Sequence, residues 1–307
     1  MSPEWARVAP EHEKIERVIE TLYSLPIAEF RKVPYRPPPM STDVPIPGRD
    51  ISIREAKVPV RDGHDISIRI YEPLNLGQNH MLFFNIHGGG WTVGSPETEE
   101  AQNRLIAARN EAVVVSVDYR KYKILVATSP AYPSLTLFRA PEYPFPYALN
   151  DCYDVLLWCI SSSESLGVEK DSIILGGGSA GANIVAALAQ IVRDEGINGI
   201  IGQVLNIPVT CHPDHFPRSE YEYGSYTQNA NAPIVNAARM RLYWSYYLPS
   251  GAADPRASPL LASSLAGLPP ALIQVAGMDP LRDEGLAYAQ ALKDSGHGFE
   301  AKLIFRD

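Results

Sequence analysis

The sequence has few cysteines, no excess of positive charge and no long hydrophobic run. Its three cysteines are too few, and odd in number, for a disulfide framework. They form no CxxC pair either, which makes a reducing compartment the simpler expectation. The formal net charge of −8 argues against nucleic acid or an anionic membrane as the main partner, because both bind basic surfaces. No stretch approaches the roughly 18 apolar residues of a membrane-spanning helix.

Targeting and metal-binding patterns are also missing. The opening letters, MSPEWARVAPEHEK, hold acidic residues where a signal peptide has a basic and then an apolar stretch. His212 and His215 lie close together in TCHPDHF, but no further clustered ligands support a metal site. We therefore expect a cytoplasmic protein that needs no cofactor and no metal. The oligomeric state stays open, with a homodimer as one alternative.

The chain divides into a short N-terminal segment and a long core. Residues 10–25, PEHEKIERVIETLYSL, place apolar residues at helical spacing, and a proline-rich stretch follows. We expect residues 1–45 to form a cap or lid segment and residues 46–307 to form the core. At the start of the core, ISIREAKVPV and HDISIRIYEP alternate apolar and polar residues around RDG, which predicts an antiparallel hairpin.

From residue 81 onward, short apolar runs alternate with longer helical patterns. The runs are MLFFNI, AVVVSV, SIILG, QVLNI, ALIQVAG and AKLIF. Continuous apolar strands separated by helices indicate an α/β fold, with a mostly parallel sheet and helices on both faces. The long stretch between QVLNI and ALIQVAG predicts a helical cap excursion over about residues 210–250. In such sheets the chemistry lies in loops at the carboxyl ends of the strands.

A serine between glycines follows one of these strands. Residues 177–181, GGSAG, fit G-x-S-x-G directly after an apolar strand and before a helical pattern. In this context the motif is typical of a nucleophilic serine on a sharp strand-to-helix turn, whose hydroxyl lies at a helix N-terminus that favours negative charge. Ser179 is therefore a candidate nucleophile. The alternative is a serine N-cap on a glycine-rich turn.

Three consecutive glycines follow another strand. MLFFNI runs into HGGGW, residues 87–91, which exposes a row of backbone N–H groups with no side chain in the way. This geometry suits an oxyanion hole, with Gly88, Gly89 and Gly90 as candidate donors and His87 as a residue that orients the loop. A phosphate-binding turn is the alternative, but no GK[ST] sequence accompanies the glycines.

An acid follows the strand ALIQVAG. Asp279 comes directly after this strand, and the next residue is a proline that blocks immediate helix continuation. Its position suits an acid that orients a histidine, and the order Ser179 then Asp279 matches the serine, acid, histidine order of α/β-hydrolases. Asp283 and Glu284 are interpreted as first-turn acids of the next helix, where they favour its dipole.

Six segments carry a family resemblance: HGGGW, VDYR, APEYPFPYALND, GGSAGAN, SPLLASSLAGLPPALI and GMDPLRDEG. Together they resemble the hormone-sensitive-lipase family of α/β-hydrolases, which are intracellular carboxylesterases and arylacetamide-deacetylase-like enzymes. The resemblance implies an α/β-hydrolase fold with Ser179 as nucleophile and Asp279 as triad acid. It also implies an oxyanion hole made by Gly88 to Gly90 with the amide of Ala180. The chain departs from the family at Gly178, where the family often has aspartate.

The family's histidine has no clear counterpart. The family carries it after the last strand, in a segment like PGxPHGF, whereas here the last expected strand, EAKLIF, is followed by Arg306 and Asp307. His297, in SGHGF, has matching letters but precedes that strand, so it is kept only as a candidate base. We therefore expect the sequence as written to be impaired in catalysis.

An insert interrupts one of the family segments. Deleting residues 122–139 joins VDYRK to APEYPFP, as family members read. Our hypothesis is a retained intron translated in frame, and the alternative is a genuine loop of this chain. The sequence of the native transcript decides between them.

These observations predict a serine carboxylesterase. It would hydrolyse short-chain, acetyl-like esters of small alcohols, aromatic ones included, by attack of Ser179 and release of the acid by water. The alternative is a non-catalytic, receptor-like protein that binds a small molecule on the same fold. The plant gibberellin receptor resembles this family and also lacks the histidine, although both Ser179 and Asp279 are retained here.

Overall fold

The structure is a computed structural model that describes residues 40–74, 77, 79–121, 126–129, 132–138 and 143–296, together with residues 13, 14, 16–18, 20, 21 and 25. For residues 126–129 and 132–138 it describes the backbone. The expected last strand, AKLIF, and His297 lie outside the described residues.

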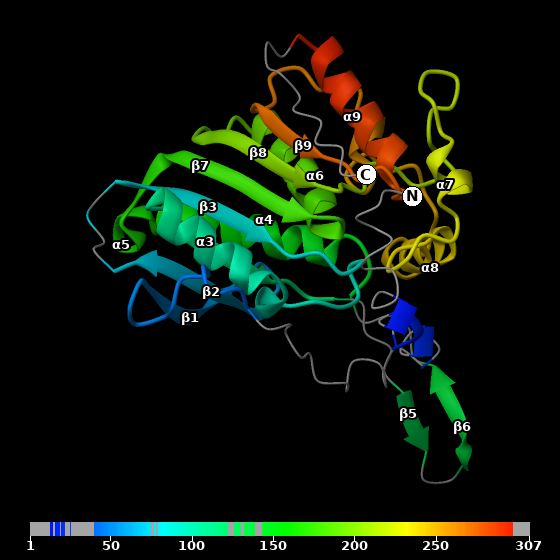
Figure 1. Ribbon diagram of the computed structural model, residues 1–307, viewed down its shortest axis with the longest axis horizontal. Helices are drawn as coiled ribbons and strands as arrows, with labels where there is room; N and C mark the ends of the chain where they lie inside the picture. The colour runs from blue at the N-terminus through cyan, green and yellow to red at the C-terminus, as the bar shows by residue number, and fades with distance from the viewer. Residues whose placement is uncertain are drawn as a thin grey trace.

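A seven-stranded sheet forms the centre of the described chain, in the order β1-β2-β4-β3-β7-β8-β9 (Figure 1). Its strands are β1 Ile51–Pro59, β2 Asp65–Pro73, β3 His80–Ile86, β4 Val113–Asp118, β7 Val168–Gly178, β8 Ile200–Asn206 and β9 Ala271–Gln274. β1 and β2 form the predicted antiparallel hairpin, and β2 pairs antiparallel with β4. From β4 to β9 the neighbouring strands run parallel.

Helices cover both faces of this sheet. They are η1 Pro96–Glu99, α3 Glu100–Asn110, α4 Tyr147–Ser161, α5 Ser163–Leu166, α6 Ala180–Asp194, α7 Ser225–Gln228, α8 Ala237–Tyr247, η2 Pro259–Leu261 and α9 Arg282–Asp294. α3 packs over β1, β2 and β4, while α6 packs over β3, β7 and β8 and also contacts α4. The mostly parallel sheet between helices confirms the predicted α/β fold class.

The two faces of the sheet carry separate hydrophobic cores. Successive strand residues point to opposite faces, so Phe83 and Val114 belong to a small core with Ala107 of α3. Their neighbours Phe84 and Val115 belong to the large core that includes α4 and α6. Burial on both faces explains why these strands read as continuous apolar runs rather than as alternating ones.

The cap excursion contains α7 and α8, and α8 lies against the loop after β3. The Trp91 ring stacks on Tyr247 with 4.1 Å between ring centroids and packs on Trp244 at 4.9 Å. The described residues between 13 and 21 are helical, as predicted. From this segment Glu16 Oε1 accepts a hydrogen bond from Arg239 of α8 at 2.9 Å.

The insert forms a hairpin of its own. β5 (Val126–Ser129) and β6 (Tyr132–Phe138) pair antiparallel as a two-stranded sheet that is separate from the main one. Figure 1 shows this hairpin, in green, pointing away from the body of the protein. A two-stranded sheet has little independent stability in water.

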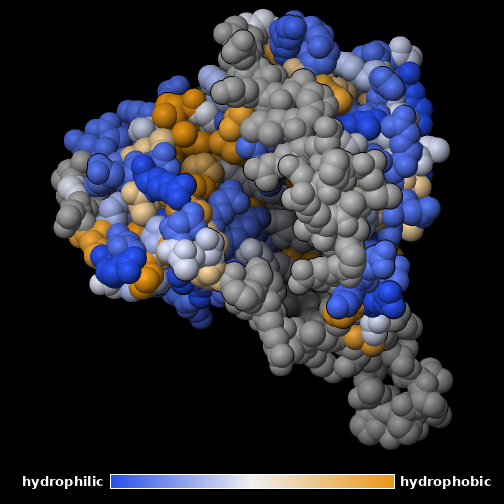
Figure 2. Space-filling model, in the orientation of Figure 1, coloured by the Kyte–Doolittle hydropathy of each residue, from blue (hydrophilic) through white to orange (hydrophobic). Residues whose placement is uncertain are grey.

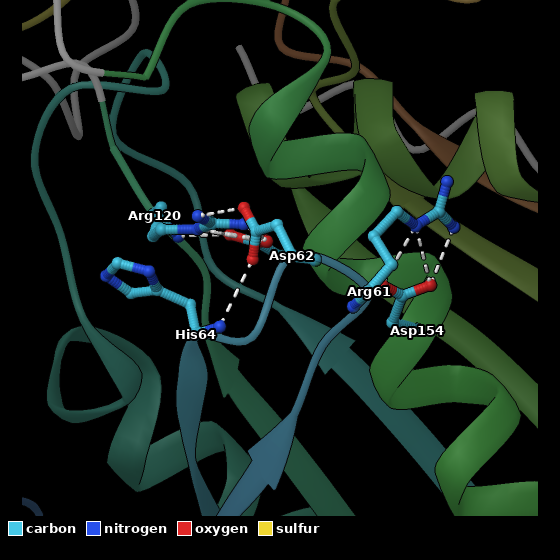
Figure 3. A network of polar contacts seen from close by, with 6 residues as sticks. Arg61, Asp62, His64, Arg120 and Asp154 are labelled. Atoms are coloured by element: carbon cyan, nitrogen blue, oxygen red, sulfur yellow. Dashed lines mark hydrogen bonds and ion pairs between the residues drawn. The ribbon is translucent and has the colours of Figure 1, made fainter.

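Arg120, which precedes the insert, forms ion pairs with two acids (Figure 3). Arg120 donates to Asp151 of α4 at 2.5 Å and to Asp62, in the turn between β1 and β2, at 2.6 Å. Its guanidinium lies 5.0 Å from the ring centroids of both Tyr143 and Tyr147. Arg120, before the insert in the chain, and Tyr143, after it, therefore contact each other, and Arg120 also joins α4 to the turn between β1 and β2.

The described surface is mainly hydrophilic on the face shown in Figure 2, where hydrophobic side chains occur in small separate groups. Among the described residues, Met278 and Ile234 are hydrophobic side chains that are half-exposed. Among the residues that the structure describes, no helix has the length and apolar character needed to cross a membrane.

Candidate active site

Ser179 lies on the sharp turn between β7 and α6. Its φ of 51° and ψ of −114° form a combination that non-glycine residues rarely adopt and that is typical of functional sites. The Ser179 N–H donates to the carbonyl of Asn206 at 2.8 Å, and its carbonyl accepts from the Asn183 N–H at 3.0 Å. Its side chain makes no capping hydrogen bond to α6, which favours the nucleophile interpretation over the N-cap.

The glycine loop after β3 lies directly against this turn. A Cβ on Gly88 would lie 2.9 Å from the carbonyl oxygen of Gly178 and 3.7 Å from Ser179 Cβ. A Cβ on Gly181 would lie 1.9 Å from the carbonyl oxygen of Ile86. Side chains at these positions would push the loop and the turn apart. The HGGG and GxSxG motifs, distant in sequence, therefore meet at the carboxyl ends of the adjacent strands β3 and β7.

The amides of the three loop glycines differ in what they bind. The Gly88 N–H donates to Glu99 Oε1 at 3.0 Å, so it is already engaged within the protein. The N–H groups of Gly89 and Gly90 have no acceptor in the described part of the chain. Ala180 is the first residue of α6, where N–H groups lack helical partners. The arrangement favours Gly89, Gly90 and Ala180 as oxyanion donors, with Gly88 as the anchored residue of the loop.

His87 is a neutral, fully buried ring beneath this loop. Its Nδ1 lies 2.6 Å from the carbonyl oxygen of Gly88, and its ring stacks on Tyr119 at 4.4 Å between centroids. Burial, with a contribution from Lys121, lowers the pKa of His87 to about 3. These contacts support the expectation that His87 orients the loop.

Asp279 lies in the loop that follows β9, at the same edge of the sheet. Its Oδ1 accepts from the Leu281 N–H at 2.8 Å, and its backbone carbonyl accepts from the Asn229 side chain at 3.1 Å. Burial raises the pKa of Asp279 to about 6. The high pKa reflects a carboxylate that gains one backbone hydrogen bond and, among the described residues, no cationic partner.

Asp279→Asn is expected to stabilise the fold above pH 6. The pKa of the acid rises from 3.8 to about 6 on folding, so the folded state binds the proton more tightly and stability falls as pH rises through this window. The asparagine side chain does not ionise, so the variant avoids this loss in the free energy of unfolding, which is about 1–3 kcal/mol. Thermal denaturation should show a higher Tm for the variant at pH 7.5 and equal values near pH 4. A difference that is the same at both pH values would contradict this.

Two other histidines near the cap are held by other groups. The Nδ1 atom of His212 accepts from the Asp214 N–H at 3.2 Å, and its ring packs on Trp244 at 4.9 Å. The Nε2 atom of His215 lies 2.7 Å from the carbonyl oxygen of Gly251. Within the described ranges, no group of three His, Cys, Asp or Glu side chains could hold a metal ion.

Asp283 and Glu284 lie in the first turn of α9, as predicted, but Glu284 is buried there. Its side chain is fully buried, and its Oε1 accepts from the Thr210 N–H at 2.9 Å. Burial raises the pKa of Glu284 well above its ordinary range. Glu284 therefore ties α9 to the loop after β8, while Asp283 accepts from the amides of Gly224 and Ser225 in the cap. The sequence pattern of an acidic residue in the first turn of a helix does not reveal whether its side chain is buried or exposed.

The fold and this serine turn define an α/β-hydrolase, and known proteins agree. Residues 83–122 and 125–304 match a family described as alpha/beta hydrolase fold. An arylesterase of Saccharolobus solfataricus is 35% identical over 244 residues, covering 79% of this chain and 71% of that protein. The carboxylesterase NlhH of Mycobacterium tuberculosis is 33% identical over 258 residues, covering 82% of this chain and 72% of that protein. A solved hyperthermophilic esterase from Pyrobaculum calidifontis has a TM-score of 0.71 and 32% identity, covering 97% of this chain and 82% of that one.

The chain therefore belongs to the hormone-sensitive-lipase-like family of α/β-hydrolases. It is by descent a carboxylic ester hydrolase, which confirms the resemblance carried by its motifs.

Proposed function

We propose that this chain hydrolyses short-chain, acetyl-like esters of small alcohols, aromatic ones included, with Ser179 as nucleophile. The observation that carries the proposal is the strained, uncapped serine beside a glycine loop with free N–H groups. Two relatives of the chain, an arylesterase and a carboxylesterase, support carboxylic esters as the substrate class.

The geometry supports acyl transfer in two steps. Ser179 Oγ attacks the ester carbonyl and its proton passes to a base, while the amides of Gly89, Gly90 and Ala180 hold the oxyanion. One such donor is typically worth about 3–4 kcal/mol in the transition state. The alcohol leaves with the proton, and water then releases the acid from the serine. Asp279 would orient the histidine that serves as base.

The packing of α8 on the glycine loop supports a small acyl group. A Cβ on Gly90 would lie 2.5 Å from Cγ of Tyr243, so this ring covers the loop closely. Tyr243 itself is buried. Trp91 continues the same layer through its stack on Tyr247. Helix α8 therefore packs closely on the glycine loop through Tyr243 and Tyr247, and this close packing favours a small acyl group.

We also propose that residues 1–307 by themselves turn over slowly. In the described residues no imidazole contacts Asp279, whose pKa is raised to about 6 by burial. A serine without its base retains only the acceleration supplied by binding and the oxyanion hole, about 10³–10⁴ over water.

The test compares 4-nitrophenyl acetate hydrolysis by the purified chain, by Ser179→Ala and by a version extended with a PGxPHGF-like segment. Without the added histidine we expect slow turnover that Ser179→Ala leaves nearly unchanged, because the residual rate comes from binding and the oxyanion hole. With the extension we expect a serine-dependent rise of at least about 100-fold. Equal rates for the extended chain and its Ser179→Ala variant would overturn the proposal. Tight binding of a small ligand without turnover, unchanged by the extension, would favour the receptor-like alternative.

A further inference from the structure

Glu99, an acid that no sequence motif singled out, bridges the glycine loop and β3. It is the last residue of η1, and its Oε1 accepts from the Gly88 N–H at 3.0 Å. Its Oε2 accepts from the side-chain amide of Asn85 at 2.9 Å. Asn85 is buried within β3, two residues before His87. The carboxylate therefore lies under the start of the oxyanion loop.

Gly178, the residue before the nucleophile, leaves room for this carboxylate. A Cβ on Gly178 would lie 3.3 Å from Glu99 Oε1, which is closer than ordinary van der Waals contact. The φ of Gly178 lies outside the positive range, so its backbone is compatible with a side chain. The atom that a side chain at this position would meet first is the Glu99 carboxylate oxygen. This is also the position where the family often has aspartate.

We propose that Glu99 is a positioning residue of the oxyanion hole, which holds the Gly88 N–H in place of a carboxylate carried on residue 178. The expected effects of Glu99 on reaction rates rest on the proposed ester hydrolysis. The hydrogen bond between Glu99 and Gly88 does not depend on that proposal.

The physical reason lies in the flexibility of three consecutive glycines. Such a segment has many accessible backbone conformations, so its N–H groups point at one place only if the peptide planes are held. Gly88 is held on both sides, because its N–H meets Glu99 and its carbonyl meets His87 Nδ1 at 2.6 Å. A hydrogen bond to a carboxylate is stronger than one to a neutral acceptor. Glu99 is partly buried, and this burial raises the pKa of its carboxyl group.

The test transfers the carboxylate from one residue to the other. Glu99→Ala should lower the rate of Ser179 phosphonylation by a fluorophosphonate, and kcat for 4-nitrophenyl acetate, by at least about tenfold with little change in KM. Gly178→Asp alone should also lower both, because two carboxylates then compete for one N–H. The double variant should return to within about threefold of the unmodified chain, since the carboxylate is restored.

Two control variants separate the carboxylate from its bulk and from the general effect of removing an acid. Gly178→Asn in the Glu99→Ala background fills the same space without charge and should restore less than Gly178→Asp does. Glu97→Ala removes an acid from the same short helix, one whose ion pair with Arg69 is half-exposed, and should leave both rates unchanged. Failure of Gly178→Asp to restore the rate of Glu99→Ala, in a chain that melts normally, would overturn the proposal.

A measurement that needs no reaction at Ser179 separates this inference from the proposed function. Amide hydrogen exchange of Gly88, followed by NMR on chain labelled with ¹⁵N-glycine, should quicken at least about tenfold in Glu99→Ala and slow again in the double variant. If Ser179 reacts in none of the variants, the proposed function fails while this exchange still decides the role of Glu99. Unchanged exchange at Gly88 in Glu99→Ala would overturn the inference.

Discussion

Asp151→Ala is expected to lower the free energy of unfolding by about 3–5 kcal/mol. The Asp151 side chain is fully buried in α4 and accepts from the Arg120 side chain at 2.5 Å and from its backbone N–H at 2.9 Å. The Arg120 side chain is only 10% exposed, so removing the acid leaves a buried charge with Asp62 as its remaining ion pair.

The matched control is Asp154→Ala, one turn further along α4. Asp154 also pairs with an arginine, Arg61, at 2.6 Å, but that arginine is 48% exposed (Figure 3). Exposed pairs contribute about 0–1 kcal/mol, because water solvates each partner after the loss of the other. Urea denaturation of the two variants measures both changes. Losses of equal size would show that burial does not govern these two ion pairs.

Gly181→Ala is expected to reduce ester hydrolysis and Ser179 phosphonylation by about 100-fold. The new Cβ would lie 1.9 Å from the carbonyl oxygen of Ile86 and 2.7 Å from that of His87. These are backbone atoms at the end of β3 that cannot rotate away. The first turn of α6 would have to move from β3, which separates Ser179 from the oxyanion donors.

Gly202→Ala is the matched control for this prediction. Gly202 lies in β8 of the same sheet, where the nearest atoms to a new Cβ would be 3.7 Å away. Its φ lies outside the positive range, so alanine fits without strain. Rates of phosphonylation and 4-nitrophenyl acetate hydrolysis should match those of the unmodified chain. If Gly181→Ala kept full reactivity, the turn that carries Ser179 would tolerate separation from β3.

The described strands of the insert, residues 122–139, do not join the main sheet. Its hairpin, β5 and β6, pairs with itself outside the main sheet. The residues on either side, Arg120 and Tyr143, contact each other across its base. A shortened chain lacking residues 122–139 would therefore keep this contact, in agreement with the hypothesis that the family segment is complete without the insert.

Local patterns in the sequence determined the order of strands and helices and the position of the serine turn. The strands are continuous apolar runs because both faces of the sheet are covered, and this pattern is visible in single segments such as MLFFNI. A Cβ on Gly177 would lie 2.6 Å from the backbone carbonyl carbon of Gly181, so the glycines of the GxSxG pattern partly reflect a contact within the turn itself. Asp279 is placed by the strand that precedes it.

Only the tertiary structure decided which groups complete the site. The bond between Gly88 and Glu99 depends on how the connection between β3 and α3 folds back on itself. Glu284 and Thr210 are 74 residues apart in the sequence, and they meet because β8 lies beside β9 in the sheet. A carboxylate next to an amide gains a hydrogen bond and loses water only once those strands are in place. The sequence identifies each carboxylate and each backbone amide, but the folded arrangement of strands and loops determines which of them come into contact.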